Sequence, residues 1–248
     1  MKNHDEPRYQ ISIVLVLRSL LRMPAYWVPT LLFPVLLFGV IGSHESPGLP
    51  TTFAMASFAA YAVIGVGFYQ FGVSIAMDRE TQWERYRRTL PGATGPRIVS
   101  QITVGTVFAF AAVLLVIAGG FLMMRPDADA NAIVRLIIAS LAIAPPFTLI
   151  GIALGYLTSA KASVPVANLV FLPFAYLGGL WTPPGRLPET VAAISPWLPT
   201  RHAGEIVWAT VGPQPFPWES IWILVGYSVL FIVVVAWAYN RDERQRYA

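Results

Sequence analysis

The chain has 248 residues, of which 56% are hydrophobic and only 12% carry a charge. A soluble domain averages about 25% charged residues, so this composition argues against a soluble enzyme. Disorder is excluded as well, because it requires low hydrophobicity and a high net charge. Cysteine is absent, which removes disulfides, thiolate nucleophiles and cysteine metal sites from consideration. A long apolar chain of this kind points to the membrane.

The first 24 residues predict an amphipathic helix at the cytoplasmic membrane surface. Polar residues recur at near-helical spacing against an apolar face that includes Ile11, Val14 and Leu21. Asp5 and Glu6 do not fit a secretory signal peptide. Pro24 favours a break before the next segment, although a first span extended backwards through residues 18–22 is the alternative.

Six apolar segments of about 20 residues predict six transmembrane helices. They cover residues 25–42, 53–77, 98–124, 133–157, 163–182 and 219–239. Strands of a membrane barrel would be shorter, about 10 residues, and would alternate in polarity. We therefore expect an all-α membrane protein that forms a single transmembrane domain over residues 1–248.

The basic residues predict the orientation of these spans. If the N-terminus is cytoplasmic, 13 of the 17 Lys and Arg residues lie on the cytoplasmic side. The outer side keeps Arg125, Arg135, Arg186 and Arg201. The bias places both termini in the cytoplasm and accounts for most of the net charge of +4, so no nucleic-acid partner is expected.

The loop between spans two and three, residues 78–91, reads DRETQWERYRRTLP. Acidic residues begin this segment and arginines end it, an order that suits the helix dipole. Trp83, Tyr86 and Leu90 form one stripe at helical spacing, and Pro91 ends the helix. A short charged helix with an aromatic ridge favours docking into a partner protein, and an interfacial lipid anchor is the alternative.

The outer loop between spans five and six, residues 183–218, contains eight of the 21 prolines. Two apolar stretches within it, residues 188–195 and 199–211, predict short re-entrant or interfacial helices packed on the outer end of the protein. Four tryptophans in this region, Trp181, Trp197, Trp208 and Trp218, also fit an outer aromatic belt.

Two motifs resemble the ABC type II exporter permeases. The first is the loop DRETQWERYRRTLP, which carries Gln82 where many members have Gly. The second is the sequence GGLWTPP, followed by Leu187-Pro188 and then ISPWLPTRH. The six spans and the cytoplasmic termini agree with this family, and the resemblance covers the whole chain.

The resemblance implies a half-transporter that pairs with a second copy or a paralogue. It also implies a separate ATP-binding cassette subunit that would bind ATP and Mg²⁺, while this chain hydrolyses no ATP and needs no cofactor. The second–third loop would be the coupling helix. The implied contacts to the ATPase are Glu80, Trp83, Glu84, Arg85 and Arg88. The implied outer gate residues are Trp181, Pro188, Pro196 and Trp197.

The resemblance also places spans two and five along the substrate pathway, which makes Gln70, Asn168 and Tyr176 candidate substrate contacts. Each could instead bond to a neighbouring helix. All 13 acidic residues lie at the ends of the predicted spans or in loops, which disfavours a proton-driven carrier. A mostly apolar pathway suits an amphipathic or lipophilic cargo, such as a drug, an antibiotic or a lipid, better than an ion.

No catalytic or metal site is expected. The sequence GYLTSAKA at residues 155–162 falls short of a phosphate-binding loop, because Ala160 replaces a Gly and Ala162 lacks a hydroxyl. His202 and Glu205 are three residues apart, but without a third ligand they predict a surface polar pair rather than a metal site.

The sequence thus predicts the permease subunit of an ATP-driven exporter, a multi-pass protein of the cell (inner) membrane in contact with lipid. A non-transporting membrane subunit that anchors a cytoplasmic partner is the alternative, and a secondary carrier is a weaker one.

Overall fold

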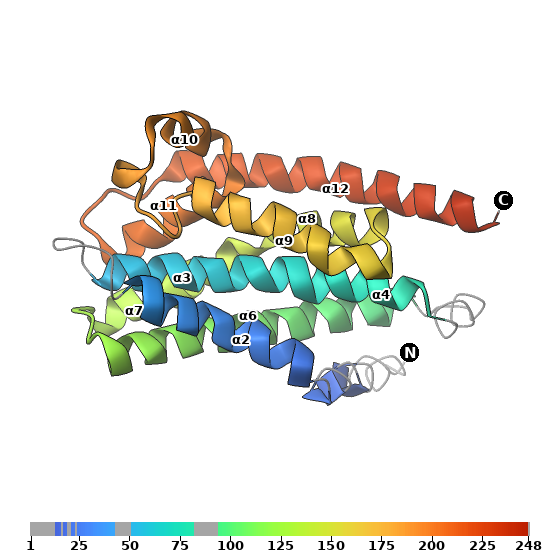
Figure 1. Cartoon of the computed structure of the whole chain (residues 1–248), viewed down its shortest axis with the longest axis horizontal. Helices are drawn as coiled ribbons and strands as arrows, with labels where there is room; N and C mark the ends of the chain where they lie inside the picture. Colours follow the sequence, from blue (N-terminus) through green and yellow to red (C-terminus); the bar gives the residue numbers. More distant parts are fainter. Residues whose placement is uncertain are drawn as a thin grey trace, which may run out of the picture.

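The computed structural model describes residues 13–15, 17–18, 21–22, 24–42, 51–81 and 94–247. This part of the chain is almost entirely helical and contains no strand. The helices run roughly parallel or antiparallel in one bundle (Figure 1). Five of them are long and apolar enough to cross a membrane. The prediction of an all-α membrane protein is therefore confirmed.

The helical elements begin and end close to the predicted segments. In chain order they are α2 (Pro24–Leu37), the π-helix η1 (Phe38–Gly42), α3 (Thr51–Val66), the π-helix η2 (Gly67–Val73), α4 (Ser74–Arg79), α6 (Thr94–Met123), α7 (Ala130–Ala142), α8 (Ala144–Leu157), α9 (Ala160–Leu177), the 3₁₀ turn η3 (Pro184–Arg186), α10 (Glu189–Ile194), the 3₁₀ turn η4 (Ser195–Trp197), α11 (Pro199–Val211) and α12 (Trp218–Tyr247).

The five candidate spans match predicted spans two to six. They are Thr51–Arg79, Val99–Met123, Ala130–Leu157, Ala160–Leu177 and Trp218–Arg244. The first predicted span, residues 25–42, coincides with α2 and η1, whose apolar stretch Thr30–Ile41 is shorter. A count of six spans therefore stays a prediction.

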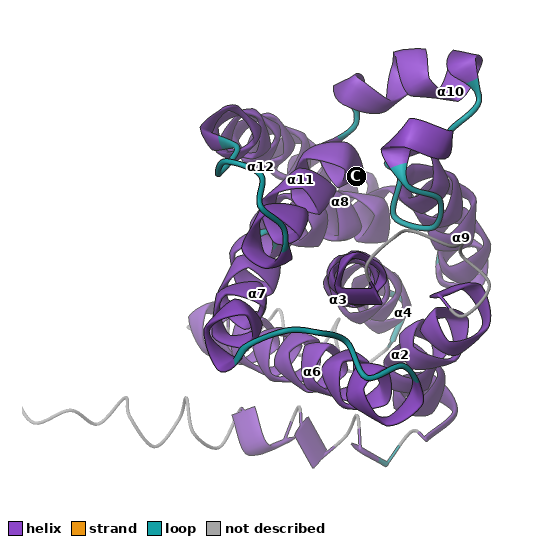
Figure 2. Ribbon diagram, turned by 90° about the vertical axis from the view of Figure 1, so that its left-hand side faces the viewer, coloured by secondary structure: helices purple, strands orange, loops and turns teal. Residues whose placement is uncertain are grey.

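The second span, formed by α3, η2 and α4, is the central element of the bundle. Figure 2 shows α3 surrounded by the other helices, and 83% of the most apolar window of this span is buried. Small residues such as Ala56, Ala59 and Ala60, none of them exposed, let neighbouring helices approach closely. Around this axis the core is filled by aromatic rings, including Phe38, Phe58 and Tyr61.

Glycines allow α8 to lie directly against η2. A Cβ atom on Gly151 would stand 2.1 Å from the carbonyl oxygen of Gly67, and one on Gly155 would stand 2.7 Å from that of Gly72. A real Cβ atom cannot come this close to a carbonyl oxygen, so α8 and η2 can approach each other only because residues 151 and 155 are glycines. The Gly-x-x-x-Gly spacing thus provides a close contact between two helices.

The predicted fourth span is two helices rather than one. The helix breaks at Ile143, between α7 and α8, and Pro145 and Pro146 stand in the first turn of α8. Proline is tolerated there because the first turn of a helix has unpaired N–H groups in any case. One crossing of the membrane is therefore divided into two segments that pack differently.

The bundle has two distinct ends (Figure 1). We call the end at which α4 and α12 finish and α2 begins the C-terminal end. The opposite end carries residues 184–211, which we call the cap. The predicted helices of the outer loop are confirmed, since α10 and α11 occupy the two apolar stretches.

The two cap helices differ in burial. Most of α11 is buried between α3, α7, α9 and α12. In α10 no residue is buried and Ile194 is 51% exposed, although α10 contacts α9 and the adjoining Ser195 is buried. Figure 2 shows α10 at the edge of the bundle, and close packing of this stretch on the outer end of the protein stays a prediction.

Most of the predicted N-terminal interfacial helix lies outside the described residues. Among those described, Ile13 and Leu17 pack against the hydrophobic core, whereas Val14, Leu15 and Leu21 are exposed. The side chain of Arg18 is exposed too. This division agrees with an amphipathic segment beside α2 and α6, as Figure 2 shows.

Candidate functional site

Four of the predicted coupling residues, Trp83, Glu84, Arg85 and Arg88, lie outside the described residues. The fifth, Glu80, follows directly after α4 at the C-terminal end of the bundle. Its Oε1 accepts a hydrogen bond of 2.7 Å from the backbone N–H of Ala160, the first residue of α9. The carboxylate thus sits at a helix N-terminus, where the unpaired N–H groups and the dipole favour a negative charge.

Arg79, which the sequence did not single out, makes the strongest polar contact of this region. Its Nη2 lies 2.6 Å from Oδ1 of Asp242 on α12, and its Nη1 donates to the carbonyl oxygen of Gly155 on α8. The two side chains are only 11% and 5% exposed. Removing one partner would leave the other charge buried and unpaired, at a cost of about 3–5 kcal/mol, so the two side chains that join α4 to α12 depend on each other.

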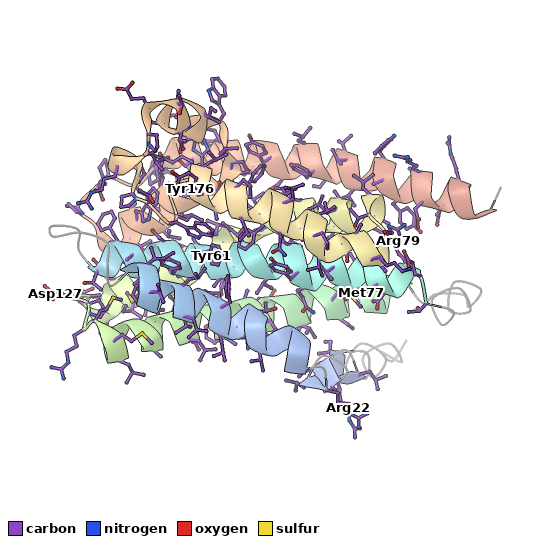
Figure 3. The ribbon with its side chains drawn as sticks, in the orientation of Figure 1. Arg22, Tyr61, Met77, Arg79, Asp127 and Tyr176 are labelled. Carbon is purple, nitrogen blue, oxygen red and sulfur yellow. The ribbon has the colours of Figure 1, made fainter. Side chains whose placement is uncertain are left out.

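The Arg79 guanidinium lies over one aromatic ring. Its central carbon lies 5.4 Å from the ring centre of Tyr156, which in turn meets Tyr239 of α12 edge to face at 5.5 Å. Figure 3 places Arg79 at the C-terminal end of the bundle, next to Met77. Four elements, α4, α8, α9 and α12, therefore meet where the predicted coupling segment begins.

Sequence reasoning missed Arg79 and Asp242 for a definite reason. They are 163 positions apart, and the arginine was counted only as one of many cytoplasmic basic residues. One signal was available, because Asp242 is the first acidic residue after the sixth span and stands between Arg241 and Arg244. A carboxylate this close to the end of a transmembrane span is expected to have a cationic partner.

The pathway candidates are brought together only in part. The hydroxyl of Tyr69 donates a hydrogen bond to Oδ1 of Asn168, which joins η2 to α9. Gln70 lies in η2 and is 6% exposed, so its side chain faces the interior of the bundle. Tyr176 lies about two helical turns from Asn168 toward the cap (Figure 3). Asn168 thus makes a bond to a neighbouring helix, and its role as a substrate contact stays a prediction.

Phe171 packs against several of the aromatic rings near these polar groups. It is 1% exposed, and its ring centre lies 4.6 Å from that of Tyr61, 5.5 Å from that of Phe68 and 6.0 Å from that of Tyr69. The sequence analysis did not identify Phe171, because a single Phe in an apolar span gives no distinguishing pattern.

The predicted gate residues do not form one cluster. Trp181 packs against the core with its ring centre 6.0 Å from that of Tyr61. Trp197 is 78% exposed, and only its carbonyl oxygen is engaged, by the hydroxyl of Tyr227. Pro188 precedes α10 and is exposed, and the carbonyl oxygen of Pro196 lies 2.8 Å from Nε2 of His202.

His202 and Glu205 belong to a partly buried hydrogen-bond network and not to an isolated surface pair, since Glu205 is 31% exposed and Arg201 22%. His202 is 7% exposed, and its Nδ1 lies 3.0 Å from the hydroxyl oxygen of Ser220. That hydroxyl donates to Oε2 of Glu205 at 2.6 Å, and Nε of Arg201 donates to Oε1 at 2.8 Å. The network joins α11 to the start of α12.

The hydrogen bonds of this network bear on metal binding by His202 and on the pKa of Glu205. The Pro196 carbonyl can only accept, so Nε2 of His202 donates to it, and Nδ1 shares a hydrogen bond with the Ser220 hydroxyl. No group of three metal-ligating side chains occurs in the described residues. The neighbouring His202, whose Nδ1 lies 3.5 Å from Oε2, lowers the pKa of Glu205 to about 2 together with the hydrogen bonds from Ser220 and Arg201, although burial opposes this shift.

Comparison with known proteins agrees with this architecture. The chain is 22% identical over 198 residues to a Bacillus subtilis (strain 168) protein named "Putative transport permease YvfS", which covers 76% of this chain and 77% of that protein. Residues 8–211 match the family described as ABC-2 type transporter, which includes the central span, the segment after Glu80 and the whole cap. The chain is therefore a member of the ABC-2 type transporter family of membrane permeases.

Proposed function

We propose that this chain is the membrane-spanning subunit of an ATP-driven exporter for an amphipathic or lipophilic substrate. Hydrolysis of ATP, with Mg²⁺, belongs in this proposal to a separate ATP-binding cassette subunit on the cytoplasmic face. A second copy of the chain, or a paralogue, completes the pathway across the cell (inner) membrane. The positive-inside bias puts the C-terminal end of the bundle in the cytoplasm and the cap outside.

The attachment of Arg79 and Glu80 is the observation that carries this proposal. These two consecutive residues bind α12, α8 and the first residue of α9, and the charged segment 82–91 follows them immediately. A partner protein that docks on this segment would thus act next to residues that are bonded to α8, α9 and α12. A loop that merely joined two spans would not need these bonds.

The composition of the interior supports an apolar cargo. Aromatic and small aliphatic side chains fill the region between α3 and α9, and the Tyr69–Asn168 pair and Gln70 are its polar groups near mid-span. Selection of an ion would call for rings of charge or of converging carbonyl groups. A lipophilic molecule needs only apolar contacts with a few polar groups to orient it.

Co-expression with the candidate ATPase subunit tests the proposal. We expect the two proteins to co-purify from membranes, and we expect Glu84→Ala and Arg85→Ala to lower the ATPase rate of the complex several-fold. Glu219→Ala and Arg186→Ala, which remove exposed charges near the cap, serve as matched controls and should leave the rate unchanged. Equal behaviour of both sets would rule out docking through the 82–91 segment.

Vesicles that contain the complex separate transport from anchoring. With a lipophilic fluorescent dye as probe, we expect movement across the membrane that depends on ATP and is lost on Glu84→Ala. A complex that hydrolyses ATP in a permease-dependent way but moves neither the dye nor labelled phospholipid would favour the anchoring alternative instead.

A further inference from the structure

The last helix of the bundle, α12, makes polar side-chain contacts with other elements near both of its ends. Only 11% of the most apolar window of the span within α12 is buried, and its main neighbours are α8 and α11. Its polar contacts lie at Asp242 near one end and at Ser220 and Tyr227 toward the other. Much of its length between them, including Val229, Val233 and Trp237, is exposed.

The ion pair of Asp242 connects α12 to Arg79, at the start of the proposed coupling segment. Arg79, one residue before Glu80, bonds to Asp242 and to the Gly155 carbonyl at the same time. Because Gly155 itself presses on Gly72 and Ile75, with less than 3 Å left for a Cβ atom, the end of α4 cannot shift without moving α8. The same shift would also displace α12, because the buried carboxylate of Asp242 is bonded to Arg79.

The contacts at the other end reach the cap. Ser220 donates to Glu205 of α11, and the Tyr227 hydroxyl donates to the carbonyl oxygen of Trp197 in η4. Ser220 and Asp242 are separated by about 33 Å of continuous helix at 1.5 Å per residue, close to the thickness of a bilayer core. Figure 1 shows α12 as one long uninterrupted helix, and a helix of this kind can carry a displacement along its axis.

We propose that α12 is a rigid connector between the coupling segment and the cap, with the Arg79–Asp242 ion pair as its inner joint and the Ser220 and Tyr227 hydrogen bonds as its outer one. The proposal rests on the function proposed above and deepens it. Arg79 and Asp242 are positioning residues here, which act through the helix and touch no cargo. Coupling would thus run beside the central span as well as through it.

The absence of cysteine provides a direct test. In the intact complex with its ATPase subunit, Ile194→Cys on exposed α10 is the only thiol of this chain. Its rate of labelling by a membrane-impermeant maleimide is measured with and without Mg-ATP and vanadate. We expect ATP to change this rate, and we expect Asp242→Asn to reduce the change at least fivefold while the ATPase subunit stays bound.

Matched variants keep the test decisive. Glu243→Gln neutralises the adjacent carboxylate and should retain the full ATP-dependent change. Asp242→Glu keeps the charge and should restore most of it, and Tyr227→Phe is the loss variant if Asp242→Asn does not fold. Tyr227→Phe should reduce the change as well. In a double-mutant cycle the effects of Tyr227→Phe and Asp242→Asn should not add, although sites this far apart are normally independent.

The outcomes distinguish this inference from the proposed function. If Asp242→Asn matches Glu243→Gln, or if the double-mutant effects add, the connector is refuted while the exporter proposal stands. Loss of ATPase binding in a folded Asp242→Asn protein would also overturn it, since the pair would then serve docking. If the parent complex shows no ATP-dependent change at all, the failure belongs to the proposed function.

Discussion

The indole Nε1 of Trp208 donates a 2.7 Å hydrogen bond to the hydroxyl oxygen of Ser57, and this bond joins the cap helix α11 to the central helix α3. Trp208 is 8% exposed and Ser57 is 7% exposed. The pair therefore fixes the position of the cap relative to the axis of the bundle, and the other polar contacts of α11 depend on that position.

Trp208→Phe should lower the free energy of unfolding by about 1–3 kcal/mol, because the buried serine loses its donor and the smaller ring leaves a gap. Thermal unfolding of the purified protein in detergent measures the change. Trp197→Phe, at a side chain that is 78% exposed, is the matched control and should leave the transition in place. Equal shifts would show that the Ser57 bond contributes nothing.

Gly151→Ala should destabilise the bundle by about 1–3 kcal/mol or more, since the new methyl group would meet backbone atoms of Gly67 that cannot rotate away. Gly226→Ala provides the comparison within another span, where a Cβ atom meets nothing within 4 Å. That change should leave stability the same or raise it. A tolerated Gly151→Ala would mean that α8 and η2 separate easily.

The cap network predicts a loss of stability in acid. The pKa of Glu205 is lowered from 4.5 to about 2, so the folded chain binds fewer protons than the unfolded chain between these values. The stabilisation is complete above pH 4.5 and disappears as the pH falls through about 2. Glu205→Gln should lose stability at neutral pH, and its difference from the parent protein should shrink in acid.

Measuring the unfolding temperature from pH 6 to pH 2 in both proteins tests this prediction. Glu189→Gln, on exposed α10, is the control and should follow the parent curve. A constant difference between the parent protein and Glu205→Gln across the range would contradict the role of the ionised carboxylate.

Thr200→Val should cost about 0.5–1.5 kcal/mol, because the buried hydroxyl donates to the carbonyl oxygen of Phe174 at 2.6 Å. The cost stays modest because that carbonyl also accepts from the backbone N–H of Gly178. Thr190→Val makes the same change at an exposed position and should be neutral. Thermal unfolding again gives the comparison.

Much of the fold follows from local sequence. The bounds of α11 match the predicted stretch 199–211, because Pro199 marks the first turn and apolar residues recur along it. The exposure of α10 could not be predicted in the same way. Apolar residues such as Ile194 indicate burial, but they do not indicate what provides it.

The candidate site was harder to predict because its contacts are not local. The charge of Arg79 is visible in the sequence, whereas its attachment to Asp242 depends on how α4 and α12 meet. The spacing of His202 and Glu205 was noticed, but their burial requires Ser220 from another helix. Asn168 was identified as a polar group, and Tyr69 became its partner only through the packing of η2 on α9.

The break at Ile143 divides the bundle into two layers along its length. Toward the cap, α7 packs against α11, and toward the C-terminal end, α8 packs against η2 and α12. A single crossing of the chain thus contributes one helix to each layer, and the two helices are joined at Ile143. Substitutions in α7 thus alter the contacts with α11, whereas substitutions in α8 alter those with η2 and α12, so the two halves of this crossing can vary separately.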